Sequence, residues 1–183
     1  RKLYSAIAIN TEQADLVGLD HIREKVLIGR YILKGRGVGA DIELAANVAE
    51  KALSQIMDRI EILVRRHDPE AFWIAAGLAG GTGAGGAFVL ANELKRIYKN
   101  IPVYGLGVVP AVSGMPSDKE ALILSNTVKS FELWNHYFNN ILLVDNQQYE
   151  QQIVSRESVE KSFQRINRQL ALMLTTLLSA GEI

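Results

Sequence analysis

The 183-residue chain has no cysteine, no surplus of either charge and no long hydrophobic run. The lack of cysteine excludes disulfides, thiolate metal sites and cysteine nucleophiles, and it suits a reducing cytoplasm. The 20 basic and 20 acidic side chains balance, whereas a general binder of nucleic acid or anionic membranes carries a basic surplus. Apolar runs end well before the roughly 20 residues that span a bilayer. The three histidines are scattered, so we expect no metal site built from them.

Segments with the patterns of strands and helices alternate along the chain. Short apolar runs predict strands, and apolar residues that recur every three or four positions predict helices. The expected strands cover residues 3–9, 25–28, 72–78, 101–109 and 141–144, and the expected helices cover about 42–67, 88–98, 120–138 and 155–179. Asp41 is suited to cap the first of these helices. The alternation predicts a Rossmann-like α/β fold, with a mostly parallel sheet and helices on both faces.

Polar and glycine-rich loops follow the predicted strands or precede the predicted helices. They lie at Asn10, at 35–41, at 80–86, after Pro110 and at Asn146. In open parallel sheets, ligands bind beyond the carboxyl ends of the strands. We therefore expect these loops to gather along one edge of the sheet and to form the binding site.

Residues 80–86, GGTGAGG, place five glycines in seven positions between a predicted strand and a predicted helix. Without Cβ atoms the backbone can approach an anion closely, and N–H groups at the start of a helix point toward it. Thr82 adds a hydroxyl donor. We interpret the segment as a phosphate cradle, and a tight packing turn between strand and helix is the alternative.

Two common phosphate motifs fit this segment poorly. The glycine run lacks the Lys-Ser or Lys-Thr ending of a P-loop. Gly81, Gly83 and Gly86 match the dinucleotide fingerprint G-x-G-x-x-G, which also requires an acidic residue at the end of the next strand to hold the ribose. The strand predicted over 101–109 ends without one. A dinucleotide-dependent oxidoreductase is therefore the second hypothesis.

The string AGGTGAGG after an apolar strand resembles the glycine-rich signature of the tubulin/FtsZ superfamily of GTP-binding cytoskeletal proteins. AINT at 8–11 resembles the second strand and loop of that family, and IGRYILKGRGVGAD at 28–41 resembles the loop around the terminal phosphate. The strings AGLAGGTGAGGAFVLANELKRIY, VYGLGVVP and LALMLTTLLSAGEI are similar in particular to the archaeal CetZ group. The resemblance covers essentially the whole chain.

The resemblance implies a bound guanine nucleotide, GTP or GDP, with Mg²⁺ held mainly by its phosphates and by water. It assigns the α- and β-phosphates to the backbone amides of Gly81, Thr82, Gly83, Ala84 and Gly85. It brings residues 37–41, with Gly39, Ala40 and Asp41, to the γ-phosphate. It implies that Asn10 also contacts the nucleotide.

The base and ribose contacts are implied further along the chain. Asn146 would touch the ribose or base, and Asn167 would pair with guanine from the long C-terminal helix. An amide can donate to and accept from a purine edge at once, although a solvent-facing Asn167 is the alternative.

The family places a glutamate for the ribose hydroxyls in the loop after the strand predicted over 101–109. Asp118 and Glu120 bracket the expected place, on which Lys119 can fall. Glu120 is our choice, and ordinary acidity at a helix start is the other explanation.

The same resemblance implies a division at residue 154, with a nucleotide-binding domain over 1–154 and a long central helix over 155–183. The chain begins with Arg1, and we expect the first strand, the first glycine-rich loop, the hydrolysis loop and the activation domain of the family to be absent from it. No residue is therefore assigned a catalytic role. The expected protein is a cytoplasmic GTPase that polymerises head to tail and controls cell shape or division. A nucleotide-binding regulator that does not polymerise is a further alternative.

Overall fold

The computed structural model describes residues 4–150 and 159–179. Its five strands are β1 (Ile7–Asn10), β2 (Glu24–Leu27), β3 (Phe72–Gly77), β4 (Val103–Val109) and β5 (Asn140–Asp145). Its helices are α1 (Gln13–Val17), α2 (Arg30–Leu33), α3 (Ile42–His67), α4 (Thr82–Ile97), α5 (Ser117–Tyr137), α6 (Asn146–Glu150) and α7 (Val159–Ser179). Strands and helices alternate as the sequence predicts.

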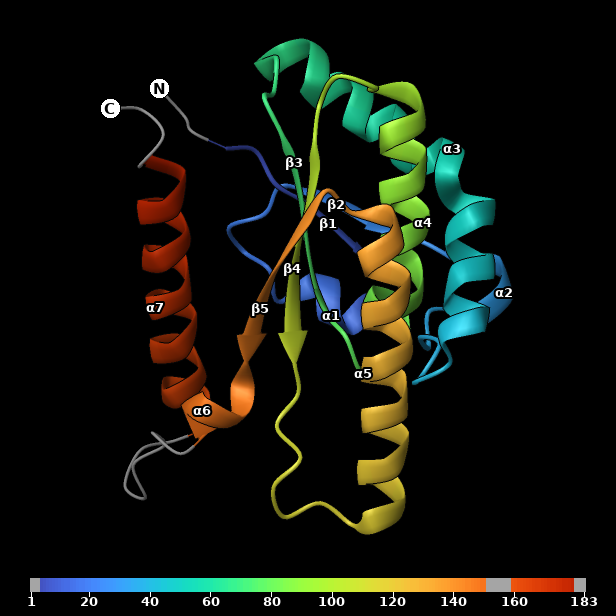
Figure 1. The fold of residues 1–183 in the computed structure, drawn as a ribbon. Coiled ribbons are helices and arrows are strands. Elements are labelled where there is room, and N and C mark those ends of the chain that lie inside the picture. Colours follow the sequence, from blue (N-terminus) through green and yellow to red (C-terminus); the bar gives the residue numbers. More distant parts are fainter. Residues whose placement is uncertain (1–3, 151–158, 180–183) are drawn as a thin grey trace.

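Every strand pair in the described part of the chain is parallel. β1 pairs with β2, and β3, β4 and β5 form a second sheet in that order. Helices α4 and α5 pack on one face of the three-stranded sheet, α3 lies beside α4, and α7 lies on the other side of the sheet (Figure 1). The predicted fold class, a parallel α/β architecture with helices on both faces, is confirmed.

Helix α3 is capped and oriented as its sequence predicts. The Asp41 carboxylate accepts a hydrogen bond from the Leu44 amide at 2.9 Å. The inward face of the helix is apolar, and Ala45, Val48 and Ile56 are at most 2% exposed. Burying such a stripe stabilises a helix more than its intrinsic propensity does. This stripe packs against α4 in the hydrophobic core.

Helix α4 begins at Thr82, six residues before the predicted start, so most of the glycine run is helical. Glycine disfavours helix interiors, which is why we expected a loop there. Tertiary packing explains the difference, because a Cβ on Gly85 would collide with the carbonyl oxygen of Ile42 and lie 2.9 Å from the Cβ of Ala45. A glycine at this position lets α4 approach α3 closely.

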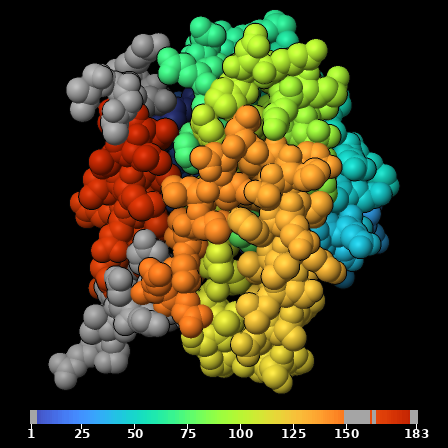
Figure 2. Space-filling model, viewed as in Figure 1, coloured from blue at the N-terminus to red at the C-terminus, as the bar shows by residue number. Residues whose placement is uncertain are grey.

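The long C-terminal helix is present over the described residues 159–179, and the predicted residues 155–158 and 180–183 lie outside them. Its buried contacts centre on Ile166, which is 4% exposed. Met173 and Leu177, which follow Ile166 at helical spacing, are 42% and 52% exposed. In the space-filling view, residues of α5 and β5 form the near face between α7 and α3 (Figure 2).

Candidate nucleotide site

A cavity of about 400 Å³ lies between the loops that follow β1 and β3 and the segment between α2 and α3. It is lined by residues 10–12 with Asp15, by residues 36–39, and by residues 80–83 with Gly77. Asn10, Gly39, Gly81, Thr82 and Gly83 are therefore brought together as predicted from the order of the loops. The cavity includes no part of the loop after Pro110.

The start of α4 supplies the donors of this cavity. Its N-cap, Gly81, makes no side-chain capping hydrogen bond, and its first turn contains no acidic residue. The first four N–H groups of a helix have no intrahelical acceptor, and here they belong to residues 81–84, of which residues 81–83 line the cavity. The partial positive charge of the helix end adds to them. The cavity therefore has the chemistry of an anion site.

Ala84 and Gly85, two of the five residues predicted for the phosphates, do not line this cavity, and their roles stay predictions. The Gly85 amide donates to the Gly81 carbonyl at 2.8 Å, so it is engaged within α4. Ala84 is fully buried. The glycine at position 85 serves packing against α3, which is the alternative that the sequence left open, while residues 81–83 face the cavity.

Residues 37–39 pack directly on residues 80–83, the glycine turn at the start of α4. A Cβ on Gly81 would collide with the Gly39 carbonyl oxygen and lie 2.5 Å from Cγ2 of Val38. Gly39 itself has a φ of 61°, a left-handed conformation that glycine adopts without strain. The loop predicted for the γ-phosphate thus lies in contact with the segment predicted for the other phosphates.

Thr11 is a part of the site that sequence reasoning missed. Its side chain is 1% exposed, and its hydroxyl lies 2.6 Å from the hydroxyl of Thr82. This hydrogen bond joins the loop after β1 to the start of α4, although β1 and β3 are not paired to each other. The conformity of AINT to the family pattern was the signal that could have identified it.

Ionisable side chains of both signs line the cavity. Glu12 and Asp15 supply carboxylates, and Arg36 supplies a guanidinium. Asn10 organises this wall, because its side-chain oxygen accepts from the amides of Thr11 and Glu12 while its nitrogen donates to Asp15 at 3.0 Å. The described residues contain no cluster of three or more His, Cys, Asp or Glu side chains that could hold a metal by themselves.

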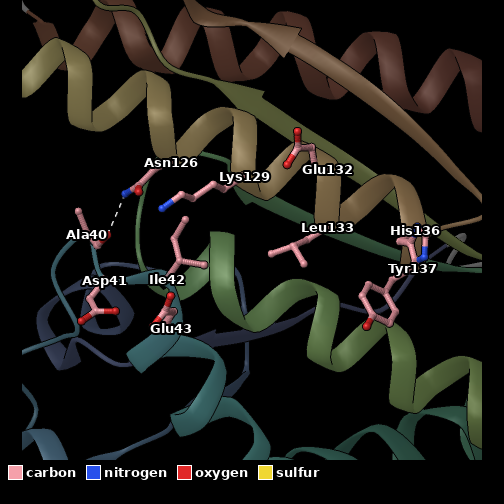
Figure 3. A pocket seen from close by; sticks show the side chains of 10 residues that line it. All are labelled: Ala40, Asp41, Ile42, Glu43, Asn126, Lys129, Glu132, Leu133, His136 and Tyr137. Atoms are coloured by element: carbon pink, nitrogen blue, oxygen red, sulfur yellow. Dashed lines mark hydrogen bonds between the residues drawn. The ribbon is translucent and has the colours of Figure 1, made fainter.

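Asn126, a second residue that we did not predict, contacts both the loop of residues 37–41 and the residue that precedes the glycine turn. It comes from α5, is 6% exposed, and donates from Nδ2 to the carbonyls of Ala40 at 2.8 Å and Ala79 at 3.1 Å. Ala40 and Asp41 line a neighbouring groove of about 580 Å³ between α3 and α5 instead of the first cavity. Figure 3 shows Asn126 reaching across this groove to Ala40.

The three residues predicted for ribose and base come from separate elements. Glu120 lies in the first turn of α5, Asn146 begins α6 directly after β5, and Asn167 is exposed on α7. None of them lines either cavity. Their roles remain predictions.

No helix in the described part of the chain has the length and apolar character that a membrane crossing requires.

Two side chains with shifted pKa values, Glu93 and Tyr98, lie away from the cavity. Glu93 has its pKa lowered by a hydrogen bond from Arg96 near the far end of α4, and burial raises the pKa of Tyr98.

Comparison with known proteins gives consistent relatives. Residues 1–154 match the tubulin/FtsZ family, GTPase domain. The chain is 39% identical over 181 residues to the tubulin-like protein CetZ1 of Haloferax volcanii and 41% identical over 179 residues to CetZ3 of the same organism. These matches cover 98% and 97% of the chain but only 43% of each relative. The chain thus spans less than half the length of these relatives.

Solved structures agree with the sequence matches. The GDP-bound monomer of Haloferax volcanii CetZ1 superposes with a TM-score of 0.83 at 37% identity, covering 96% of this chain and 51% of that one. The GTPγS-bound protofilament of CetZ2 gives a TM-score of 0.85 at 37% identity, covering 97% of this chain and 50% of that one. The family match over residues 1–154 and these relatives establish that the chain belongs to the tubulin/FtsZ family.

Proposed function

We propose that the cavity at the start of α4 binds the phosphates of a guanine nucleotide, GTP or GDP. The observation that carries the proposal is the uncapped N-terminus of α4, where residues 81–83 line a cavity closed on the opposite side by residues 37–39. Backbone amides in this arrangement bind phosphate without any charged side chain. Relatives described as bound to GDP and to GTPγS support guanine as the base.

Mg²⁺ fits the acidic wall of the same cavity. Two carboxylates, Glu12 and Asp15, would repel a triphosphate that arrived without a counterion. Mg²⁺ prefers oxygen ligands and retains several waters, and it is commonly held by phosphates with one or two carboxylates nearby. We propose that the phosphates hold the ion and that these two side chains face its water shell.

The base end of the nucleotide extends from the phosphates toward α6 and α7 under this proposal. Glu120 and Asn146 then contact the ribose, and Asn167 pairs with the guanine edge. The exposure of Asn167 leaves its amide free to meet a ligand from outside. These assignments follow from the family resemblance, and each awaits a direct test.

In the full-length protein, we propose a cytoplasmic GTPase whose copies stack head to tail with the nucleotide between them. The protofilament described for CetZ2 supports this assembly. A head-to-tail interface joins two different surfaces and therefore generates open polymers. Hydrolysis would weaken the contact, coupling nucleotide state to assembly and so to cell shape or division.

Calorimetric titration with GTP, GDP, ATP and NAD tests the binding proposal, using Thr82→Glu and Thr82→Gln as a matched pair. A glutamate at the first position of a helix is compatible with folding, because negative charge suits the helix N-terminus. A carboxylate about 4 Å from a phosphate at an effective dielectric constant near 20 costs about 4 kcal/mol before screening. We expect Thr82→Glu to weaken GTP binding at least tenfold and Thr82→Gln, which adds the same bulk without charge, to weaken it much less.

Selective binding of GTP and GDP that Thr82→Glu removes would support the proposal. Binding of NAD without a guanine preference would refute it in favour of the dinucleotide-dependent oxidoreductase. Sedimentation of the full-length protein with GTP then tests assembly. Nucleotide binding without sedimentable polymer would instead favour the regulator that does not polymerise.

A further inference from the structure

The side chain of Asn126 connects two loops that are far apart in the sequence. Its Nδ2 donates to the carbonyl of Ala40, in the loop expected at the γ-phosphate, and to the carbonyl of Ala79, directly before the glycine turn. A side-chain amide nitrogen has two N–H donors, and each serves one of these carbonyls. In the described part of the chain, no other side chain hydrogen-bonds to both loops.

We propose that Asn126 is a positioning residue that holds the loop of residues 37–41 against the glycine turn and thereby sets the affinity for the terminal phosphate. This inference rests on the proposed nucleotide function. It goes beyond it by assigning to α5 a role in distinguishing a nucleoside triphosphate from a diphosphate.

The geometry of the peptide group explains how Asn126 acts at a distance from the ligand. In a planar trans peptide, the C=O and the following N–H point in opposite directions. Fixing the Ala79 carbonyl toward α5 therefore directs the N–H of Gly80, which lines the cavity, away from α5. The same bond keeps the partial negative charge of that carbonyl away from an anion in the cavity.

The loop of residues 37–41 includes two glycines, so holding it in one conformation costs more entropy than holding an ordinary loop. Gly37 and Gly39 both have positive φ angles, and glycine loses more conformational freedom on ordering than any other residue. Its contact with the glycine turn consists of the packing of Val38 and Gly39 on Gly81, which has no directional bond. The Asn126 hydrogen bond to Ala40 supplies the direction.

The decisive variants are Asn126→Asp and Asn126→Ala, with Asn135→Asp as the matched control. Aspartate has the shape of asparagine but donates nothing when ionised, and it faces two carbonyl oxygens with a negative charge. Asn135 is exposed on the same helix, so Asn135→Asp makes the same chemical change away from the loops. Calorimetry of GTP and GDP binding is measured for each variant, with circular dichroism to show that the fold is retained.

We expect Asn126→Asp to weaken the binding of both nucleotides, because it releases the Ala79 carbonyl beside the segment predicted for the α- and β-phosphates. GTP binding should fall at least tenfold more than GDP binding, because only the γ-phosphate meets the loop of residues 37–41. Asn135→Asp should change neither. An unchanged ratio of GTP to GDP affinity in a folded Asn126 variant would refute the positioning role, whether both affinities fell together or neither fell.

A second measurement does not depend on nucleotide. If Asn126→Asp fails to fold, hydrogen exchange in Asn126→Ala should be at least tenfold faster than wild type at residues 37–41 and unchanged along α3 beyond its first turn. Unchanged exchange in that loop would refute the anchor directly. A wild-type protein that binds neither nucleotide would refute the proposed function. The exchange experiment tests the anchor separately, because it requires no nucleotide.

Discussion

Adjacent glycines in α4 should respond to the same substitution with opposite signs. A Cβ on Gly85 would collide with the Ile42 carbonyl and come within 2.9 Å of the Ala45 Cβ and 3.0 Å of the Ala46 amide nitrogen. These are mainly backbone atoms of α3, so the two helices must separate to admit a methyl group. A Cβ on Gly86 meets only the Ala49 Cβ at 3.6 Å, an ordinary contact.

The magnitudes follow from two opposing effects. Overpacking a well-packed contact costs typically about 1–3 kcal/mol, and a collision with backbone belongs at the upper end. Replacing glycine by alanine inside a helix returns about 1 kcal/mol. We therefore expect Gly85→Ala to lower the free energy of unfolding by about 2 kcal/mol and Gly86→Ala to raise it by up to about 1 kcal/mol.

Urea denaturation followed by circular dichroism measures both variants against the wild type. The midpoints should move in opposite directions while the slope of free energy against urea stays constant. Equal or greater stability of Gly85→Ala relative to Gly86→Ala would show that α4 does not lie as close to α3 as described. The packing explanation for the glycine at position 85 would then be wrong.

Three further predictions concern local interactions. Asp41→Ala removes the cap of α3 and should lower the free energy of unfolding by about 1 kcal/mol in urea denaturation, whereas Asp41→Asn should retain most of it. Ser130→Ala should raise the free energy of unfolding by up to about 1 kcal/mol in thermal denaturation, because the buried Ser130 hydroxyl has no partner among the described residues. A decrease of that size in the free energy of unfolding would indicate that a bound water pairs with the hydroxyl. The hydrogen bond from Arg96 lowers the pKa of Glu93. The stabilisation of the folded state by this pair is therefore present above the ordinary pKa of about 4.5 and is lost as the pH falls through the lowered pKa. Glu93→Gln should remove this part of the acid dependence of the free energy of unfolding, which amounts to about 0.5 kcal/mol or less.

Local patterns predicted what depends on neighbours in the sequence. The Asp41 cap and the apolar stripe of α3 follow from spacing alone, and both are confirmed. The meeting of the loops at 10–12, 36–39 and 80–83 followed from the rule that parallel strands end at one edge. Sequence patterns therefore predicted three of the loops that meet at the cavity, whereas the loop after Pro110 and Asn146, expected at the same site, do not line it.

Features set by tertiary contact escaped prediction. The helical start at Thr82 depends on how closely α4 lies to α3, which glycine content alone does not reveal. Asn126 meets carbonyls 86 and 47 positions away, so no local pattern marks it. Thr11 gains its partner 71 positions away for the same reason. The engaged amide of Gly85 likewise follows from where the helix begins.

The most direct test of the central claim is a GDP titration of the ¹⁵N-labelled chain followed by amide NMR. Binding at the start of α4 predicts saturable shifts of the Gly81, Thr82 and Gly83 amides, with Tyr98 at the opposite end of α4 unaffected. GDP binding with unmoved amides at residues 81–83, or with shifts confined to the groove between α3 and α5, would contradict the account.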